Sequence, residues 1–536
     1  MEFDYVIVGG GSAGCVLAAR LSEDAGVRVA LVEAGGENAG VLNRVPTGAA
    51  IHVIRRNACN WAFETVPQPG LSGRRGYQPR GRGLGGSSAI NAMCFVRGQR
   101  EDYDGWAASG AAGWAWRDVL PVFKSIENNE RGANEWRGSG GPVNVADLRS
   151  PNPFQKRFIE AAQQAGLPLN PDFNGAAQDG AGPYQVTQIN GERCDASRAY
   201  LAPARARHNL VVFTGATAQR VLFGGRRARG IEFARDGKVE TLSAHREVIV
   251  ATGALQSPQL LMLSGIGPAE QLRSHGIEVI ADVPGVGRNL QDHLDIIINR
   301  RVANTDLLGL SLAGAIKLVK GIVRWRRERR GILTSNFAEA GAFVRSSPEL
   351  NRPDLQLHFV IGMVDNHNRT FHWGHGMSMH ACALRPQSRG SVTLASRDAN
   401  AAPVIDPQFL SDERDLDTMV RGFRLIRRIF AQPAFAPFGG ADRSRELYFA
   451  DVETDDQIRA AIRAHADTIY HPAGTCRMGD VAADPMAVVD PRLRVRGVDG
   501  LRVVDASIMP TLVSGNTNAP VMMIAEKAAE FVIGDP

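Results

Sequence analysis

Cysteine is scarce in this sequence of 536 residues: the six cysteines are scattered, and none forms a CxxC pair or stands among histidines at metal-ligand spacing. We therefore expect free thiols and no metal centre. No run of about 18 uncharged apolar residues occurs, which argues against a membrane-spanning helix. The first residues lack the basic and apolar regions of a secretory signal, so we expect a cytoplasmic protein. Repeats and low-complexity tracts are also absent.

The overall composition is that of a globular protein, with 44% hydrophobic and 22% charged residues. This balance excludes a disordered or fibrous chain. A single hydrophobic core stops growing near ~250–300 residues, so we expect a chain of this length to divide into two domains.

A pI of about 9.0 raises the question of nucleic-acid binding, and the location of the charge answers it. Residues 307–330 contain seven Lys or Arg and one Glu, a formal charge of +6, whereas the whole chain carries +5. The rest of the chain therefore sums to −1. No general basic surface is left to follow a phosphate backbone, so we expect no nucleic-acid partner.

The basic segment itself fits a helix, because Leu308, Leu312, Ile316, Val319 and Val323 recur at helical spacing. Basic residues lie along a neighbouring face of that helix. Two arrangements fit this pattern. The apolar stripe could pack against the protein and leave a solvated basic face, or the helix could lie on an anionic membrane surface.

The N-terminal residues follow the pattern of a dinucleotide-binding βαβ unit. An apolar strand at residues 3–8 leads into a glycine turn, a helix over 15–21 and a second strand over 27–32. The turn has the GxGxxG spacing, in which glycines let the backbone approach a pyrophosphate at a helix N-terminus. An acidic residue after the second strand accepts hydrogen bonds from ribose hydroxyls. The cofactor-binding residues expected here are Gly9, Gly11, Ser12, Ala13, Gly14, Glu33 and Ala34.

Only one such fingerprint is present, which indicates a single tightly held dinucleotide. A later strand over residues 247–252 ends in a small-residue turn that could approach the same cofactor. Two chain-distant crossings of one site predict a large, interrupted nucleotide domain. Between about Asn299 and His465 the pattern mixes helices with alternating strands, and we assign that stretch to a second domain.

Three groups of motifs resemble those of the glucose-methanol-choline oxidoreductases, in the expected order along residues 3–533. They are GRGLGGSSAIN at 81–91, GALQSP at 253–258 followed by SGIG at 264–267, and YHPAGTCRMG at 470–479 with DAS at 505–507 and NTNAP at 516–520. Within the family the chain is most similar to the bacterial choline-dehydrogenase-like and long-chain or polyethylene-glycol alcohol dehydrogenase branch. The resemblance implies FAD as the dinucleotide.

The same resemblance implies a two-domain α/β fold. A Rossmann-like FAD-binding domain would comprise residues 1–150, 190–298 and 465–536. A substrate domain with an antiparallel sheet beside helices would comprise residues 151–189 and 299–464. An FAD domain interrupted in this way agrees with the two crossings inferred from the strand pattern.

Further cofactor contacts are carried over from the family motifs. Backbone N–H groups of the 85–88 loop and the Asn91 amide suit the pyrophosphate and the flavin edge. Covalently flavinylated relatives carry histidine at the position of Ile90; isoleucine cannot bond the flavin 8α-carbon, so we expect noncovalent FAD. The residues implied are Gly85, Ser87, Ser88, Asn91, Val221, Asp505, Ala506, Asn516, Thr517 and Pro520.

The catalytic residues implied by the C-terminal motifs are His471 and Asn516. A neutral imidazole can accept the hydroxyl proton of an alcohol at neutral pH, and an amide can donate to the resulting alkoxide oxygen. Four histidines also gather at positions 358, 372, 375 and 380. No carboxylate stands beside them at metal-ligand spacing, so we expect pocket walls or partly buried polar residues.

The predicted reaction is the oxidation of a primary alcohol to an aldehyde by an FAD-dependent dehydrogenase, with electrons passing to a quinone or another acceptor than oxygen. Aromatic and aliphatic residues between Phe359 and Trp373 favour an uncharged aliphatic or aryl alcohol. Two alternatives stay open. One is an oxygen-using alcohol oxidase, and the other is a redox-neutral hydroxynitrile lyase that keeps FAD as a structural group.

Overall fold

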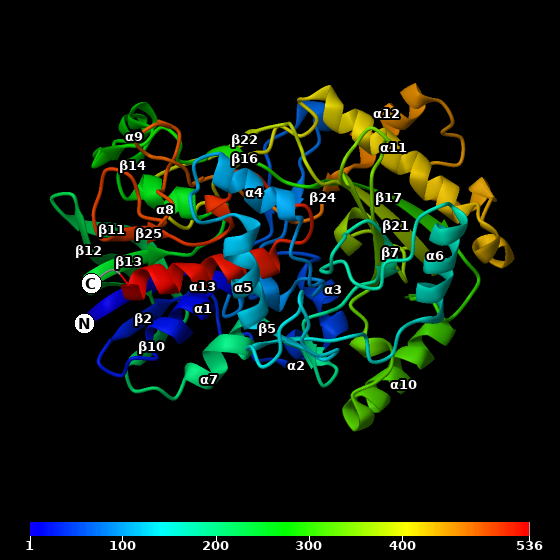
Figure 1. Cartoon of the computed structure of the whole chain (residues 1–536), viewed down its shortest axis with the longest axis horizontal. Helices are drawn as coiled ribbons and strands as arrows, with labels where there is room; N and C mark the ends of the chain where they lie inside the picture. The colour runs from blue at the N-terminus through cyan, green and yellow to red at the C-terminus, as the bar shows by residue number, and fades with distance from the viewer. Residues whose placement is uncertain (535–536) are drawn as a thin grey trace.

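The chain folds around two β-sheets, and the computed structural model describes residues 1–534 of it (Figure 1). The predicted N-terminal unit forms as β1 (Glu2–Val8), α1 (Ser12–Leu21) and β2 (Val29–Val32). All four residues of β2 are buried. This continuous apolar pattern is typical of a parallel strand that is covered on both faces.

The first sheet has the strand order β10-β2-β1-β13-β12-β11. β10 (Leu210–Phe213), β2, β1 and β13 (Lys238–Val250) run parallel, and β25 (Leu501–Val503) pairs in parallel with the end of β13. β11 (Ala216–Gly224) and β12 (Arg227–Arg235) continue the sheet in antiparallel pairing. The second crossing predicted near residues 247–252 is therefore the end of β13, beside β1.

Helices cover this sheet, and one of them comes from the far end of the chain (Figure 1). α13 (Asn518–Gly534) packs against α1 and against α5 (Trp116–Ile126). Arg20 of α1 forms an ion pair with Glu526 of α13 at 2.8 Å. Pro520, which the sequence predicts at the start of this helix, is its third residue and lies in the first turn, where proline costs no helical hydrogen bond.

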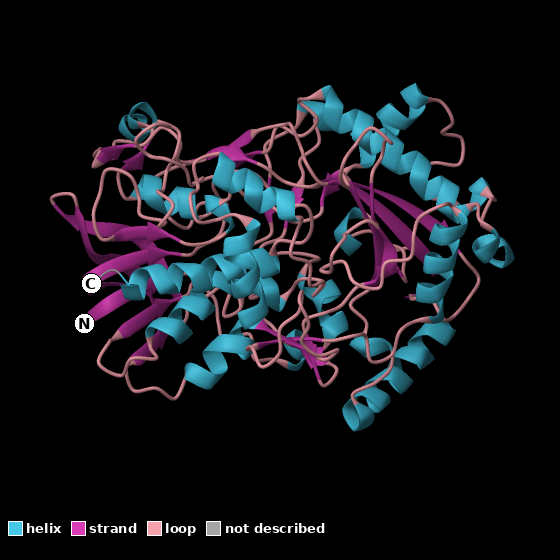
Figure 2. Cartoon of the chain, in the orientation of Figure 1, coloured by secondary structure: helices cyan, strands magenta, loops and turns pink. Residues whose placement is uncertain are grey.

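The second sheet is antiparallel and has the order β24-β17-β21-β20-β19-β7. Helices α6 (Pro153–Gln164) and α11 (Glu413–Phe430) pack against it, and Figure 2 shows them outside its strands. The strands are β24 (Asp467–Thr468), β17 (Leu294–Arg301), β21 (Gly374–Ala383), β20 (Leu355–Val360), β19 (Ala338–Val344) and β7 (Gly180–Pro183).

Side chains alternate along β20 between the helix-packed core and the opposite face of the sheet. Leu355, Leu357 and Phe359 belong to the core that α6 and α11 complete. Gln356 and His358 are buried on the opposite face. His358 is paired in register with His380 of β21, so the strand period gathers polar side chains on the face turned away from the helices.

The chain passes between the two sheets close to the predicted domain limits. β17 begins at Leu294, before the limit at 298, and β24 begins at Asp467, after the limit at 465. Both strands nevertheless pair in the second sheet. We retain the division into an FAD-binding and a substrate domain as a proposal.

The basic segment forms α10 (Leu312–Glu328), which lies at the outer edge of the molecule (Figure 1). Ser311 caps its N-terminus by accepting the Gly314 N–H. Gly321 and Trp325 are the buried residues of this helix. The apolar stripe at 312, 316, 319 and 323 is exposed, so the arrangement in which it packs against the protein is wrong.

The remaining helices and strands are mostly short. The helices are α2 (Val41–Arg44), α3 (Ala49–His52), α4 (Arg100–Ala108), α7 (Ala202–Ala204), α8 (Ser257–Leu263), α9 (Ala269–Ser274) and α12 (Asp455–His465). The strands are β3 (Phe63–Glu64), β4 (Tyr77–Gln78), β5 (Glu127–Asn129), β6 (Val143–Val145), β8 (Gln188–Ile189), β9 (Glu192–Arg193), β14 (Ile266–Gly267), β15 (Ala281–Asp282), β16 (Arg288–Leu290), β18 (Gly309–Leu310), β22 (Gly390–Thr393) and β23 (Val404–Asp406). Within residues 1–534, no helix has both the length and the apolar character to cross a bilayer.

Candidate active site

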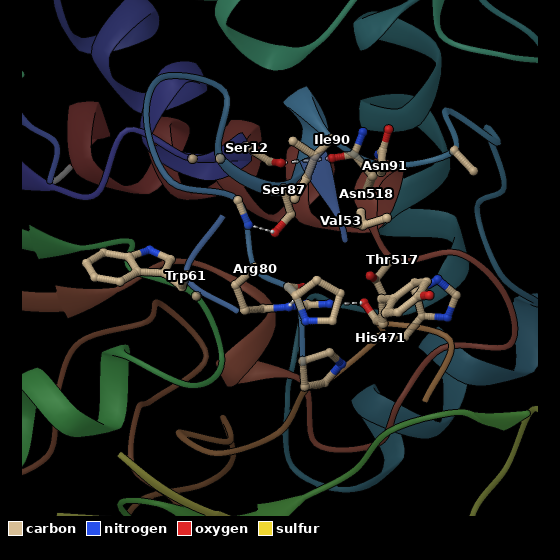
Figure 3. A pocket seen from close by; sticks show the side chains of 18 of the residues that line it. Ser12, Val53, Trp61, Arg80, Ser87, Ile90, Asn91, His471, Thr517 and Asn518 are labelled. Carbon is tan, nitrogen blue, oxygen red and sulfur yellow. Dashed lines mark hydrogen bonds between the residues drawn. The ribbon is translucent and has the colours of Figure 1, made fainter. Parts of the chain in front are cut away.

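A cavity of about 770 Å³ is lined both by the glycine turn after β1 and by residues of β19, β20 and β21. Figure 3 shows part of this cavity from close by. The predicted site residues that line it are Gly9, Gly11, Ser12, Ala13, Glu33, Ala34, Ser87, Asn91, His471, Asp505, Ala506, Asn516 and Thr517. The predicted residues outside its lining are Gly14, Gly85, Ser88, Val221 and Pro520. Segments from distant parts of the chain therefore surround one space.

The three glycines of the fingerprint have three different roles. Gly9 adopts a φ of +101°, in the region that favours glycine. A β-carbon on Gly14 would lie 1.8 Å from the Gly9 carbonyl oxygen, so α1 could not pack this close to the turn. A β-carbon on Gly11 would meet nothing nearer than the Gly86 Cα at 4.0 Å, and Gly11 lines the cavity. The space kept free at the N-terminus of α1 fits a pyrophosphate.

Glu33 lines the cavity and also ties together the loops around it. Its carboxylate accepts hydrogen bonds from the backbone N–H groups of Gly10 at 2.7 Å and of Gly35 and Gly83 at 2.8 Å. A carboxylate offers about four lone-pair sites, so one position remains for a ligand hydroxyl. The sequence predicts a ribose contact for Glu33. Its hydrogen bond to the Gly83 N–H adds a structural role, because it holds the loop at residue 83 against the end of β2.

The two serines of the 85–88 loop are engaged with the backbone. Ser87 Oγ accepts the Gly81 N–H at 3.1 Å. Ser88 Oγ donates to the Gly85 carbonyl at 2.6 Å and accepts the Ala196 N–H at 3.0 Å. Ser88 therefore holds the loop from behind, while Ser87 lines the cavity.

Asn91 and Ile90 present different groups to the cavity. Oδ1 of Asn91 accepts from the Arg193 guanidinium at 2.8 Å, which leaves its Nδ2 group as the donor available to a ligand. Ile90 presents an aliphatic side chain in the same wall. Figure 3 shows both side chains close to Ser12 and Ser87.

Asp505 joins two turns that line the cavity. Its carboxylate accepts from the Gly253 N–H at 2.9 Å, from the Ser257 hydroxyl at 2.5 Å and from the Ser507 N–H at 2.8 Å. The turn after β13 and the start of the C-terminal segment are thus held together in the cavity wall near the glycine turn.

Val221 lies away from the cavity. It is buried in the core of the first sheet, and its N–H donates to the Ser264 hydroxyl at 2.8 Å. The β11 residues in the cavity wall are Ala216, Thr217 and Ala218. The strand β11 therefore contributes residues 216–218 to the cavity, and not the predicted Val221.

His471 is buried, and its two ring nitrogens have different partners. Nδ1 lies 2.9 Å from Nδ1 of His293, and Nε2 lies 3.3 Å from Nδ2 of Asn516. The backbone N–H of His471 donates to Asp292 at 2.9 Å. The two predicted catalytic residues are thus in contact, and Figure 3 shows the His471 ring among the side chains that line the cavity.

The partners of His293 determine which nitrogen of His471 carries a proton. Nε2 of His293 lies 3.0 Å from the Leu384 carbonyl oxygen, which can only accept, so this nitrogen is protonated. In a neutral ring, Nδ1 of His293 is then an acceptor, and it faces Nδ1 of His471. His471 must donate through Nδ1, which leaves the lone pair on Nε2, next to Asn516.

Burial keeps both rings neutral. It lowers the pKa of His293 to about 4 and the pKa of His471 well below its ordinary value. The neighbouring His293, His358 and Arg80 lower the His471 pKa further. Arg80 is itself fixed by donating to the Tyr470 carbonyl at 2.8 Å. A neutral His471 with its lone pair on Nε2 can accept a proton from a ligand in the cavity.

Gln356 fixes the orientation of the Asn516 amide. Nε2 of Gln356 donates to Oδ1 of Asn516 at 3.1 Å, so Nδ2 is the group that faces His471. Two residues later on β20, burial lowers the pKa of His358 to about 3. Its Nδ1 has no hydrogen-bond partner within residues 1–534. No sequence motif predicted Gln356 or His293. The alternation of buried side chains along β20 could have indicated Gln356.

The other histidines of the predicted cluster are bonded separately. His372 pairs with Asp365 and His380 with Asp295, each at 2.6 Å. His375 lies 2.8 Å from a backbone carbonyl oxygen and, unlike the other three, does not line the cavity. In the described part of the chain, no three His, Cys, Asp or Glu side chains gather in a way that could hold a metal ion.

The cavity wall contributed by α3 and the second sheet with its loops is mostly apolar. It includes Ile51, Phe337, Val360, Met363, Val364 and Phe371. Among the described lining residues, the carboxylates are Glu33 and Asp505, and both lie with the glycine turn at the cofactor end. This part of the cavity fits an uncharged apolar ligand.

Known proteins are similar to this chain over nearly its whole length. The GMC oxidoreductase family models match residues 3–295 and 386–525. The chain is 46% identical to alcohol dehydrogenase (acceptor) of Pseudomonas putida over 536 residues, which covers 99% of this chain and 96% of the relative. It is 43% identical to oxygen-dependent choline dehydrogenase of Brucella ovis over 534 residues, which covers 100% of this chain and 96% of the relative.

The fold is shared with a solved flavoenzyme. A formate oxidase variant of Aspergillus oryzae, studied for the modification of its FAD, has a TM-score of 0.90 and 27% identity, over 100% of this chain and 98% of that one. The family models and the full-length relatives agree with each other. The chain therefore belongs to the GMC oxidoreductase family.

Proposed function

We propose that this chain oxidises an uncharged primary alcohol to an aldehyde, with His471 as the base that removes the hydroxyl proton. As a member of its family, it is an FAD-dependent oxidoreductase that acts on alcohol-type donors. The observation that carries the proposal is the lone pair on Nε2 of His471, held beside the Asn516 amide in the cavity wall.

The two side chains divide the work. An alcohol does not readily lose a hydride while its oxygen keeps its proton, because the developing carbonyl would carry positive charge. Nε2 of His471 accepts that proton, which contributes roughly 10²–10⁴-fold to the rate. The Asn516 amide and the protonated Nε2 then donate hydrogen bonds to the alkoxide oxygen. Bound FAD supplies the hydride acceptor.

The cofactor would be held without a covalent bond. The glycine turn at the start of α1 would receive the pyrophosphate, and Glu33 would accept from a ribose hydroxyl. Ile90 stands where covalently flavinylated relatives carry histidine, and its aliphatic side chain offers no nucleophile to the flavin.

The substrate class follows from the cavity wall. A quaternary ammonium group would need a carboxylate or an aromatic cage. In the described part of the chain, the carboxylates of the wall belong to the cofactor end, and the residues near the second sheet are mostly apolar. We therefore propose an aliphatic or aryl alcohol for this chain, although the relative from Brucella ovis is named for choline.

The electron acceptor is proposed to be a quinone. The name of the Pseudomonas relative states an acceptor without naming oxygen, whereas the Brucella relative is named as oxygen-dependent. A quinone is dissolved in a bilayer, and residues 307–330 are proposed to bring the enzyme to its surface. An oxygen-using oxidase is the alternative that the Brucella relative favours.

Anaerobic flavin reduction tests this proposal. The holoenzyme is mixed with octanol, benzyl alcohol, a glycol ether or choline, and the flavin absorbance is followed. We expect bleaching by an uncharged alcohol and little by choline. The reduced enzyme is then mixed with a quinone analogue or with oxygen. Rapid reoxidation by oxygen with formation of peroxide would favour the oxidase, and a flavin that no alcohol bleaches would favour a redox-neutral lyase.

A further inference from the structure

Two sides of α10 have opposite surroundings. On the inner side, Trp325 packs with Val45 and Leu333, and its indole N–H donates to the Gly191 carbonyl at 2.9 Å. Val323 is two residues before Trp325, so the two side chains point in directions roughly 200° apart around the helix axis. The apolar stripe at residues 312, 316, 319 and 323 therefore lies on the outer side. Leu312 is 78% exposed and Val319 62% exposed. A surface helix normally turns such a stripe toward the core.

Basic residues flank the exposed stripe on both sides. Within residues 1–534, Lys320, Arg326 and Arg327 have no carboxylate partner. Three others are paired, in Lys317–Asp306, Arg324–Glu328 and Arg329–Glu192. The helix therefore presents an apolar face bordered by uncompensated positive charge.

The stripe lies next to an opening of the cavity. Four residues both line the cavity and are exposed: Leu310 of β18, Leu318 of α10, Ile51 and Phe371, which is 65% exposed. Trp373 is 74% exposed, and its backbone pairs with that of Leu310. We name these five exposed apolar residues the mouth rim. Residues that line a cavity and reach the surface mark its entrance. Leu318 is seven residues before Trp325 and so lies on the Trp325 side of α10. The exposed Ile322 lies between Leu318 and Val319 around the helix, so the mouth rim continues into the α10 stripe through Ile322.

We propose that the mouth rim and the outer side of α10 dock on an anionic lipid bilayer, with the cavity opening toward the lipid. The apolar stripe would enter the headgroup region, and the flanking Lys and Arg would pair with anionic headgroups. Trp373 is of the type that anchors proteins at this interface. An apolar alcohol and a quinone would then pass between bilayer and cavity without crossing water. This role of the docking, though not the docking itself, rests on the proposed function.

A second copy of the chain fits this surface less well. A two-fold interface sets the same patch of both subunits face to face, so the basic flanks would meet each other. Like charges brought together at an interface disfavour association. An anionic lipid surface is complementary to both features of the patch, its apolar centre and its positive borders.

Co-sedimentation of the holoenzyme with vesicles tests the docking. Phosphatidylcholine vesicles with about 30% phosphatidylglycerol are compared with pure phosphatidylcholine, since anionic lipid is the variable. The charge variant carries Lys320→Gln, Arg326→Gln and Arg327→Gln. The apolar variant carries Leu312→Ser, Val319→Ser and Val323→Ser. A matched control, Arg226→Gln, Arg229→Gln and Lys238→Gln, removes the same charge from the β11–β13 region, at the opposite end of the molecule from α10 (Figure 1).

We expect the parent and the matched control to bind anionic vesicles alike. The charge variant should lose at least about tenfold in partition coefficient, and the apolar variant a similar amount. Flavin content and thermal melting verify that each variant folds. Equal binding by the parent and the charge variant would overturn the inference, and so would a parent that does not bind. A parent dimer that the apolar variant dissociates would instead identify a self-interface.

One measurement separates the docking from the proposed function. Flavin reduction by a short-chain alcohol without vesicles should be unchanged in both variants, because the substituted residues do not line the cavity. If the parent binds vesicles but no alcohol reduces its flavin, the docking stands and the proposed function fails. If alcohols reduce the flavin but the parent ignores anionic vesicles, only the docking is wrong.

Discussion

His293 and His471 meet through their Nδ1 atoms, 2.9 Å apart, with their ring planes at 90°. Only one proton can occupy this contact. The Leu384 carbonyl holds the proton of His293 on the other nitrogen, so the shared proton belongs to His471. A backbone carbonyl thus determines, through an intervening ring, that Nε2 is the basic atom of His471. His293 is a positioning residue in this arrangement, since it does not line the cavity.

Substitution of His293 should therefore change catalysis without changing cofactor content. His293→Leu removes the acceptor for the His471 Nδ1–H, and a buried donor left without a partner costs about 1–3 kcal/mol. We expect flavin reduction to be roughly five- to 100-fold slower, since 1.4 kcal/mol corresponds to a factor of ten. His293→Asn can still offer an oxygen near the Nδ1 position and should lose less. Stopped-flow reduction across pH decides, and a parent-like rate in His293→Leu would refute the positioning role.

His471 and Asn516 should differ in the size of their effects. His471→Ala is expected to keep FAD but to slow anaerobic flavin reduction by at least ~100-fold, whereas Asn516→Ala should cost less. Burial lowers the His471 pKa, so the neutral base persists below the ordinary histidine range, and the parent rate should decline only at more acidic pH. Asn516→Ala should retain this profile. An FAD-loaded His471→Ala enzyme that reacts at the parent rate would show that another group is the base.

The glycine turn offers a matched pair of variants. Gly11→Ala puts a methyl group into the cavity without contacting protein atoms nearer than 4.0 Å, so it should fold normally and bind FAD poorly. Gly14→Ala brings a β-carbon within 1.8 Å of the Gly9 carbonyl oxygen and should instead destabilise the fold itself. Thermal melting of the apoproteins and FAD titration separate the two effects. Parent-like FAD affinity in Gly11→Ala would mean that the pyrophosphate lies elsewhere.

Noncovalent binding predicts that the cofactor can be removed intact. Acid or heat precipitation of the yellow holoenzyme should release FAD into the supernatant, because Ile90 cannot form a bond to the flavin. The absorbance of supernatant and pellet after centrifugation measures the partition. Flavin that stays with the washed, precipitated chain would contradict this prediction.

Glu339 should make stability depend on pH. Its carboxyl group is buried in β19, and burial raises its pKa to about 7, although it accepts from Ser335 and the Asn152 N–H at 2.6 Å each. Because the folded pKa lies above the unfolded value, its contribution is present below pH ~4.5 and is lost as pH rises through ~7. We expect Glu339→Gln to gain stability relative to the parent across this window, by roughly 1 kcal/mol per pH unit.

Melting temperatures of the parent and Glu339→Gln, measured from pH 4.5 to 8, check this expectation. Glu349→Gln removes an exposed carboxylate and serves as the control. The difference between parent and Glu339→Gln should widen as the pH rises, and the difference for the control should stay constant. Parallel curves for all three proteins would show that Glu339 has the same pKa in the folded and unfolded chain.

Local patterns predicted what depends on local geometry. The turn after β1 formed where the glycine spacing indicated, because a φ of +101° and a 1.8 Å approach allow no other residue at Gly9 and Gly14. The contact between His471 and Asn516 was accessible only through the family motifs. His293 could not be predicted, since a single buried histidine in a sequence resembles any other polar residue of a core, and its role arises from the Leu384 carbonyl.

The orientation of α10 shows another limit of sequence patterns. Helical periodicity reveals that apolar residues share one face, but it does not reveal which face meets the protein. Small Gly321 and one large indole, Trp325, provide the actual contact with the protein. These two residues contribute little to the apolar periodicity of the sequence, so the stripe at 312, 316, 319 and 323 was expected to be the packed side. Only the three-dimensional arrangement identifies the outer face.

The first sheet has a consequence for the order of events during biosynthesis. Val250 of β13 pairs with Val503 of β25, and α1 packs against α13. The ribosome synthesises β1, α1 and β2 long before β25 and α13, so the early elements lack these packing partners until late in synthesis. Pairing between segments so far apart in the sequence is slow. The same late segment supplies Asp505, Asn516 and Thr517 to the cavity wall. The cavity wall is therefore complete only after residue 517 has been synthesised.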